Sequence, residues 1–221
     1  MTRRMLSRDQ ARAFYDDFGS RQDQQGWYED AALAELLDRS ELDQAHSVLE
    51  LGCGTGRLAA RILEERLPAD ARYLGIDLSP TMQALAARRL AAFGDRARVA
   101  PAEVGTLPAR AGGWDRLIST YVLDLLPEDE ARRLLAQAHE ILAPEGRLCL
   151  AGITHGTTLP SRLVMGGWDL VHRLRPALVG GCRPTALDTL LAEGAWTVLY
   201  DGAVLRWGVA SQVLVATPRS P

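Results

Sequence analysis

Glycine occupies every second position in part of the segment Val48–Ala59, VLELGCGTGRLA. Gly52, Gly54 and Gly56 follow a strand-like run and precede a helix-like one. Glycines at such a junction permit a tight turn and let the backbone approach a ligand closely. Loops of this kind bind the phosphates of a dinucleotide, the phosphates of a nucleoside triphosphate, or a ligand that has no phosphate. The residues in and around this loop must therefore distinguish among these three kinds of ligand.

The spacing of the glycines argues against both phosphate ligands. A dinucleotide loop reads G-x-G-x-x-G, and here Arg57 stands where its third glycine belongs. A triphosphate-binding P-loop needs a lysine, but all 25 basic residues of the chain are arginine. The lack of lysine also excludes Schiff-base chemistry and a Tyr-x-x-x-Lys dehydrogenase base. These absences leave a nicotinamide-dependent oxidoreductase as a weaker alternative.

Two carboxylates near the loop indicate which ligand it takes. Glu50 lies two positions before the first glycine, where it disfavours a pyrophosphate and suits an ammonium or sulfonium group. Asp77 ends the strand-like segment YLGIDLSP, a position from which an acidic residue accepts hydrogen bonds from ribose hydroxyls. Ser79 is better placed than Asp77 to cap the following helix. The ligand is therefore expected to contain a nucleoside and a positive charge.

Short strands alternate with helices through the middle of the chain, a pattern typical of a mostly parallel sheet with helices on both faces. The expected strands are 47–51, 72–77, 98–101, 116–120 and 147–153, and the expected helices are 56–66, 80–93, 128–142 and 185–192. The segment APEG (143–146) is expected to be a turn. Two last strands, 196–200 and 208–216, are expected to form an antiparallel hairpin across the link DGAVLRW.

These segments together resemble the class I S-adenosylmethionine-dependent methyltransferases. The resemblance rests on five motifs in family order: VLELGCGTG, GIDLSPTM, ARVAPAEVGTLP, WDRLISTYVLDLLP and ILAPEGRLCLAG. It covers about half of the chain and is nearest to the ubiquinone- and menaquinone-biosynthesis branch. It implies a Rossmann-like α/β fold with a seven-stranded sheet of order 3-2-1-4-5-7-6, in which strand 7 is antiparallel. We expect one domain over residues 1–221, with a helical N-terminal cap at 1–44.

The resemblance also implies roles for individual residues. The backbone at Gly52 and Gly54 would hold the methionine part of S-adenosylmethionine, and Glu50 its ammonium. Asp77 would bind the ribose, and Glu103 the adenine amine, although the family usually has Gly-Asp where this chain has Ala-Glu. The candidate cofactor-binding residues are Tyr15, Glu50, Gly52, Cys53, Gly54, Gly56, Asp77, Leu78, Met82, Glu103, Val104 and Ser119.

Methyl transfer from a sulfonium mainly requires alignment of the acceptor, and a base helps when the acceptor is a hydroxyl or an activated carbon. His155 follows the fifth strand on the cofactor side and is the first candidate for that base. Tyr121, after the fourth strand, is a candidate to line the substrate pocket. Asp124 is expected only to begin a helix, and Tyr28 of the lead-in to close over the site or to pack on the domain.

The composition of the chain limits which kinds of binding partner are expected. The net charge of −3 lacks the excess of positive charge that is typical of nucleic-acid-binding proteins. No apolar run is long enough for a membrane span. The three scattered cysteines form neither a disulfide framework nor a zinc motif, so we expect no metal and a cytoplasmic location.

The segment 154–184 stands outside the alternating core and is expected to be a lid over an apolar substrate, with contact to a membrane surface as the alternative. The sequence thus predicts methyl transfer from S-adenosylmethionine to a small, apolar or aromatic metabolite. The alternatives are a membrane-associated lipid or quinone methyltransferase, and a protein of the same fold that binds without catalysis. The sequence does not predict the oligomeric state.

Overall fold

The computed structural model describes residues 26–219, together with residues 10, 13, 16, 19, 22 and 23. Candidate Tyr15 and most of the expected lead-in lie outside the described residues. Within them, one seven-stranded sheet has the order β3-β2-β1-β4-β5-β7-β6. Strand β7 is antiparallel to both of its neighbours, and the other pairings are parallel. The predicted fold class and strand order are confirmed.

The parallel strands are β1 (Ser47–Leu51), β2 (Arg72–Asp77), β3 (Ala97–Pro101), β4 (Trp114–Thr120) and β5 (Leu142–Ile153). Strands β1 and β2 have the predicted bounds, whereas β3, β4 and β5 begin earlier than predicted. The expected turn at 143–146 is wrong, because these residues begin β5. The register between β4 and β5 shifts at Trp114, and Gly146 lies so close to that strand that an added Cβ would be 2.7 Å from the Trp114 carbonyl oxygen. Close backbone approach, not a turn, explains this glycine.

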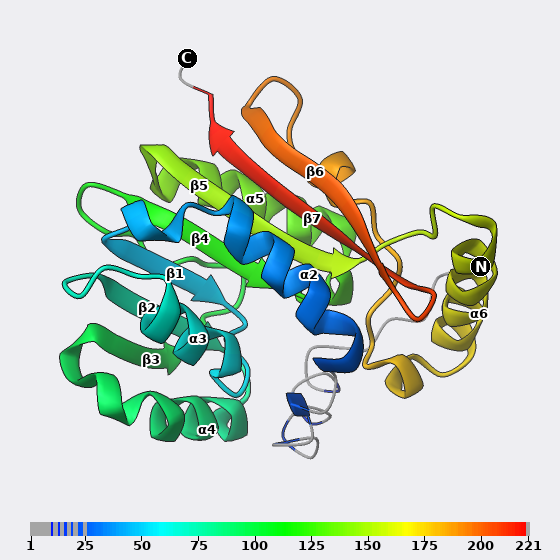
Figure 1. Ribbon diagram of the computed structural model, residues 1–221, viewed down its shortest axis with the longest axis horizontal. Coiled ribbons are helices and arrows are strands. Elements are labelled where there is room, and N and C mark those ends of the chain that lie inside the picture. Colours follow the sequence, from blue (N-terminus) through cyan, green and yellow to red (C-terminus); the bar gives the residue numbers. More distant parts are fainter. Residues whose placement is uncertain are drawn as a thin grey trace.

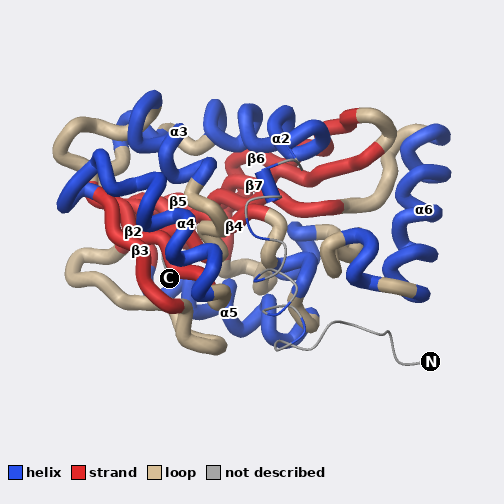
Figure 2. Tube along the Cα trace, turned by 90° about the horizontal axis from the view of Figure 1, so that it is seen from below, coloured by secondary structure: helices blue, strands red, loops and turns tan. Residues whose placement is uncertain are grey.

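Helices cover both faces of the sheet (Figure 1). On one face lie α2 (Gly26–Arg39), α3 (Arg57–Glu65) and α4 (Pro80–Leu90), and on the other lies α5 (Glu128–Ile141). Figure 2 shows α2 and α3 above the sheet and α5 below it. Ser79 caps α4 as predicted, since its hydroxyl accepts the Met82 N–H at 3.1 Å.

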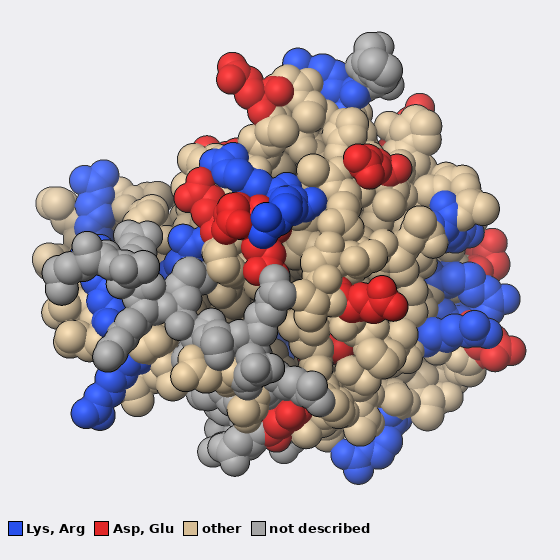
Figure 3. Space-filling view, turned by 180° about the vertical axis from the view of Figure 1, so that it is seen from behind, with Lys and Arg blue, Asp and Glu red and all other residues tan. Residues whose placement is uncertain are grey.

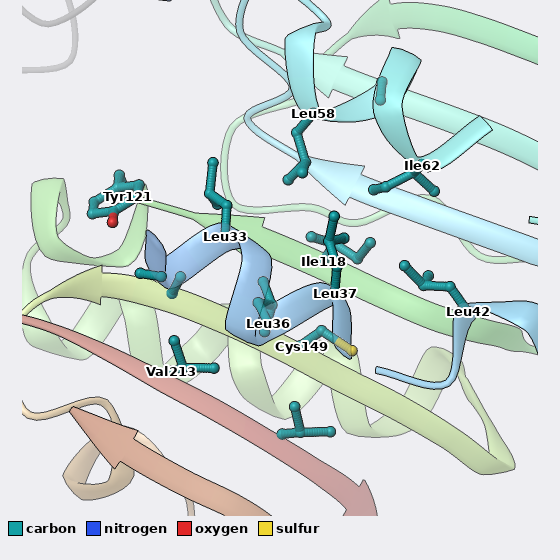
Figure 4. Close-up of a cluster of buried hydrophobic side chains, with 14 of the residues drawn as sticks. Leu33, Leu36, Leu37, Leu42, Leu58, Ile62, Ile118, Tyr121, Cys149 and Val213 are labelled. Carbon is teal, nitrogen blue, oxygen red and sulfur yellow. The ribbon is translucent and has the colours of Figure 1, made fainter. Parts of the chain in front are cut away.

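Helix α2 packs its leucines on the sheet near strands β4 and β7. Leu33, Leu36 and Leu37 are buried, and they share a cluster with Ile118 of β4 and Val213 of β7 (Figure 4). Burying each such side chain contributes about 1.5–3 kcal/mol. This packing fixes the first turn of α2 beside the glycine loop.

The C-terminal hairpin is confirmed as antiparallel, but its strands are longer than expected. Strand β6 spans Trp196–Arg206 and β7 spans Val209–Pro218, so the predicted link, except for its last residue, lies within β6. The turn is Trp207-Gly208, with φ of 53° and 83°. Two left-handed residues match the twist of a two-residue hairpin, which explains why β6 extends to Arg206.

The helix expected at 185–192 is reduced to one 3-10 turn, Leu187–Leu190. The Leu187 N–H donates to the Gln212 side chain at 2.7 Å, which anchors this segment to β7. The expected lid contains α6 (Leu159–Leu174), followed by a 3-10 turn at Pro176–Val179. Helix α6 stands at the edge of the molecule beside the hairpin turn (Figure 1). Among the described helices, none combines the length and apolar character needed to span a bilayer.

Candidate functional site

A pocket lies where β1 and β4 end, beside the first turns of α2 and α3. Its empty volume is about 580 Å³, which includes space open to solvent. It is lined by Gln22, Asp23, Tyr28, Glu29, Leu33, Glu50, Gly52, Cys53, Gly54, Thr55, Arg57, Leu58, Thr120, Tyr121 and Cys182. In an open parallel sheet, ligands bind at this edge where the strand order reverses, here between β1 and β4.

The glycine loop needs glycine for different reasons at its three positions. Gly52, Gly54 and Gly56 all have positive φ. An added Cβ at Gly52 would lie 2.3 Å from Val122 Cγ2, and one at Gly56 would lie 3.0 Å from the Ala86 Cα. Gly56 therefore serves the packing of α3 on α4, while Gly52 and Gly54 shape the pocket wall.

Glu50 is a buried carboxylate on the pocket wall. Its Oε2 accepts a hydrogen bond of 2.5 Å from the phenol of Tyr73 on β2. Burial raises the Glu50 pKa to about 8, and the negative charge of Asp77 acts in the same direction. A cationic group in the pocket would stabilise the ionised form of Glu50, as an ammonium does.

Asp77 braces the loop from the end of β2. Its Oδ2 accepts the Gly54 N–H at 2.9 Å, and its Oδ1 accepts the Ser79 N–H at 2.9 Å. Burial raises the Asp77 pKa, and these N–H groups oppose that shift. Each carboxylate oxygen can accept a second hydrogen bond, so Asp77 retains capacity for a ribose hydroxyl.

Aromatic side chains form the other end of the pocket. The ring centroid of Tyr28 lies 5.9 Å from that of Tyr121 and 6.1 Å from that of Trp168, both in edge-to-face geometry. The Trp168 indole N–H donates to the Cys182 carbonyl at 2.9 Å, which ties α6 to the pocket wall. Tyr121 has a φ of 56°, a strained value for a bulky residue, and strain of this kind concentrates at functional sites.

Glu29 brings a second buried carboxylate to the aromatic end. It is 8% exposed, and burial raises its pKa to about 7. The Tyr28 phenol and the Arg57 guanidinium oppose this shift, and Arg57 Nη2 lies 3.6 Å from Glu29 Oε2. A carboxyl with this pKa can exchange a proton near neutral pH.

Residues before α2 are bound to the glycine loop. The Thr55 hydroxyl donates to Asp23 Oδ1 at 2.6 Å, and Arg89 Nη2 of α4 lies 2.6 Å from Asp23 Oδ2. Ser79 donates to Asp16 at 2.5 Å, and the side chain of Gln22 lies over Gly54. We call the Asp23, Thr55 and Arg89 contacts the Asp23 clasp.

The pocket brings together some predicted site residues and not others. Glu50, Gly52, Cys53, Gly54 and Tyr121 line it, and Asp77 contacts it through Gly54. His155 is exposed and does not line the pocket. The remaining described candidates are also outside the lining: Gly56, Leu78, Met82, Glu103, Val104 and Ser119. Met82 and Ser119 are buried, whereas Leu78, Glu103 and Val104 are exposed beyond the ends of β2 and β3.

Asp124 lies in the first turn of a short helix, as expected, but its side chain also makes a tertiary contact. It lies within a 3-10 turn, Leu123–Leu125, and α5 begins four residues later, after Pro127. Asp124 is fully buried, and its Oδ2 accepts the Ile153 N–H at 3.0 Å. The carboxylate therefore ties the segment after β4 to the end of β5, and burial raises its pKa to about 6.

Sequence reasoning missed Glu29 and the Asp23 clasp. A glutamate in the first turn of a helix normally faces solvent and interacts with the helix dipole, so its type carries no signal of burial. Arg89 is one of two adjacent arginines in α4, and the sequence does not distinguish which one faces Asp23.

Comparison with known proteins identifies a family and several relatives. Residues 48–146 match the family described as methyltransferase domain. The chain is 28% identical to a demethylmenaquinone methyltransferase of Thermus thermophilus, over 74% of this chain and 79% of that protein. It is also 28% identical to a malonyl-[acyl-carrier protein] O-methyltransferase of Marinomonas sp., over 96% of this chain and 78% of that protein.

A solved structure shares the fold. The N-methyltransferase NodS of Bradyrhizobium japonicum, in complex with S-adenosyl-L-homocysteine, superposes with a TM-score of 0.64. The two chains are 18% identical, and the likeness covers 87% of this chain and 88% of that one.

Proposed function

We propose that this chain methylates a small, apolar or aromatic acceptor as a class I S-adenosylmethionine-dependent methyltransferase. The observation that carries the proposal is the two-ended pocket. One end has the glycine loop and Glu50, and the other has Tyr28, Tyr121 and Glu29. S-adenosylmethionine, when bound, supplies an electrophilic methyl group on a sulfonium.

The residues at the loop fit the cofactor. Glu50 is desolvated, and a ligand ammonium is the counter-charge that favours its ionised form. The positive φ values of Gly52 and Gly54 leave the backbone open to a close approach. We assign the methionine part to this loop and the ribose to Asp77. Leu78, Glu103 and Val104 lie beyond the strand ends, where the adenine is expected.

The acceptor end supports a flat or apolar substrate. Its walls are the rings of Tyr28 and Tyr121, and the Tyr121 hydroxyl is engaged by Ser211 at 3.0 Å. Aromatic walls bind planar rings by stacking and edge contacts. The relation to a demethylmenaquinone methyltransferase favours an aromatic acceptor of the quinol kind.

We assign the proton-accepting role to Glu29, because it lines the pocket and its pKa is close to neutral. An acceptor hydroxyl would transfer its proton to the Glu29 carboxylate as its oxygen takes the methyl group. Arg57, 3.6 Å from Glu29, keeps the carboxylate partly ionised. The role of His155 as the base stays a prediction. Its side chain lies outside the pocket lining.

Residues 1–221 are proposed to act as one domain in which residues 154–184 cover the acceptor. Cys182 lines the pocket, and Trp168 packs on Tyr28, so this segment already contributes to the acceptor end.

The experiment has two stages. Titration calorimetry with S-adenosylhomocysteine, run beside NADH, is expected to show saturable binding of the first alone. A panel of phenols, quinols, carboxylic acids and amines is then incubated with S-adenosylmethionine carrying a labelled methyl group. Label in an aromatic hydroxyl or ring carbon supports the proposal. Label only in amines or aliphatic acids would refute the acceptor class, and cofactor binding with no labelled product would favour a non-catalytic binding protein.

A further inference from the structure

Helix α6 has a buried face and, opposite it, an exposed apolar face. Ser161, Met165 and His172 lie on its buried face, with Trp168 between them. Leu159, Leu163, Leu170 and Leu174 are 58–80% exposed. Their spacing of four, seven and four residues places them in one stripe on the side opposite the buried face. The outer stripe is therefore not the part of the segment that covers the pocket.

Neighbouring elements carry two more exposed apolar side chains. Leu178, in the 3-10 turn after α6, is 69% exposed, and Trp207 at the hairpin turn is 74% exposed. An added Cβ at Gly208 would lie 2.7 Å from Val164 Cγ2, so the hairpin turn packs directly on α6. Figures 1 and 2 show the two elements side by side. We call these six exposed residues the α6 patch.

The surroundings of the α6 patch are basic although the chain is acidic as a whole. Segment 154–184 holds three exposed arginines, Arg162, Arg173 and Arg175, besides the buried Arg183, and one acidic residue, Asp169, against a net charge of −3 for the chain. Asp169 is paired with Arg173. Arg206 lies beside Trp207, with its guanidinium carbon 5.3 Å from the ring centroid. In Figure 3 blue atoms stand out among the tan ones at the left side of the molecule.

We propose that the α6 patch docks onto an anionic lipid bilayer. A stripe of leucines on a short helix can enter the boundary between headgroups and acyl chains without crossing the membrane. Arginines at the margin of the stripe have long side chains that reach lipid phosphates while their stems remain on the apolar surface. An exposed tryptophan is suited to the same interface. Apolar exposure on this scale marks an interaction surface.

A second copy of the chain is a less suitable occupant. A two-fold dimer through this patch would bring each arginine near its own counterpart or its neighbours, because the same surface meets itself. An anionic bilayer instead supplies the opposite charge. On the opposite, inner face of α6, the ring centroid of Trp168 lies 6.1 Å from that of Tyr28 in the pocket wall, so the helix that would bind the bilayer also contacts the acceptor end of the pocket.

The proposal is tested by flotation of the full-length protein with lipid vesicles, which requires no turnover. Vesicles of phosphatidylcholine alone are compared with vesicles that contain about 30 mol% phosphatidylglycerol. We expect flotation with the anionic vesicles and its loss at high salt. The double variant L163E/L170E is expected to bind at least about tenfold more weakly, since two charges cannot enter the apolar boundary.

The matched control is Leu199→Glu, at an exposed apolar position near the other end of β6. It is expected to float like the wild type. S-adenosylhomocysteine calorimetry on each variant checks that the fold is intact. The proposal is overturned if the wild type ignores anionic vesicles, if it floats equally with neutral ones, or if both variants lose binding alike. A stable dimer in light scattering that L163E dissociates, without vesicle binding, would assign the patch to a second copy.

Discussion

The phenol of Tyr73 donates a 2.5 Å hydrogen bond to the carboxylate of Glu50, and both side chains are buried beneath the glycine loop. The two residues lie on adjacent strands, β2 and β1, two positions out of register, since Tyr73 is opposite Val48. Because the hydrogen bond favours the ionised carboxylate while burial disfavours it, Glu50 titrates at about 8 rather than near 4.5. The loop therefore lies above a carboxylate whose charge depends on what is bound.

Cofactor affinity is expected to rise with pH for this reason. Below a pKa of about 8 the carboxyl of Glu50 is largely protonated, and binding of an ammonium requires its ionisation. S-adenosylhomocysteine affinity should then increase by up to about tenfold per pH unit between about pH 6 and 7.5. Calorimetry in buffers of different ionisation enthalpy should detect release of a proton. Glu50→Gln should bind weakly at every pH, and a wild-type affinity independent of pH would remove Glu50 from the ammonium site.

Stability without ligand is expected to fall as pH rises from about 5 to 7.5. Glu50 and Glu29 have folded-state pKa values of about 8 and about 7, above the value of 4.5 in the unfolded chain. The folded state holds protons that the unfolded state has lost, so each group lowers the free energy of unfolding by up to about 1.4 kcal/mol per pH unit. Carboxyls whose pKa is lowered in the folded state, such as Asp23, add their full contribution to the free energy of unfolding above about pH 5. They therefore do not change how stability depends on pH between about pH 5 and 7.5. Urea unfolding should show the decline, and Glu50→Gln should flatten it. A wild-type stability that rises over this range would contradict the assignment.

Gly52→Ala tests whether the loop depends on space or only on backbone conformation. Gly52 and Gly105 have φ of 74° and 72°, but an added Cβ meets Val122 at 2.3 Å in the first case and open space in the second. Both alanine variants carry the cost of a positive φ. Gly52→Ala should lose about 1–3 kcal/mol more, because the core must shift. Urea unfolding of both variants measures the difference, and equal losses would show that Val122 yields freely.

Arg89→Ala tests the Asp23 clasp. Arg89 bonds the Thr55 hydroxyl at 2.8 Å as well as Asp23, so its removal frees one side of the segment over the loop. S-adenosylhomocysteine should dissociate about three- to tenfold faster, the range for a half-exposed charged contact. Arg88→Ala, at the exposed neighbouring position, should dissociate at the wild-type rate. Stopped-flow displacement measures both, and identical rates in the two variants would limit the clasp to a structural role.

The sequence predicts the parts of this protein that depend on residues close together in the chain. Gly52, Gly54 and Glu50 belong to one strand and its loop, so their approach to one another follows from local geometry. The hairpin extends further than expected because Trp207 takes a left-handed conformation that its residue type disfavours. The segment at 185–192 bonds to Gln212, which is distant in sequence.

At the acceptor end of the pocket, too, the sequence does not predict contacts between residues that are distant in the chain. His155 lies two residues after the end of β5, yet its side chain is exposed, because position along a strand does not fix which way the next loop turns. Glu29 enters the pocket only because the leucines of α2 bind the sheet and direct its first turn toward β4. The position of Glu29 therefore depends on tertiary packing, which no local sequence pattern predicts.

Glu29→Gln tests the proton acceptor. The variant keeps the size of the side chain and removes its basicity, so kcat with a hydroxyl acceptor should fall by at least about 100-fold, while S-adenosylhomocysteine affinity stays within about twofold. Wild-type kcat should rise with pH through about 7, where Glu29 loses its proton, and this limb should vanish in the variant. Glu35→Gln, on the same helix with its side chain 30% exposed, serves as the control and should retain both the rate and the limb. If Glu29→Gln keeps the limb and His155→Ala loses it, the base is His155 and the histidine must reach the acceptor by a movement of the loop after β5.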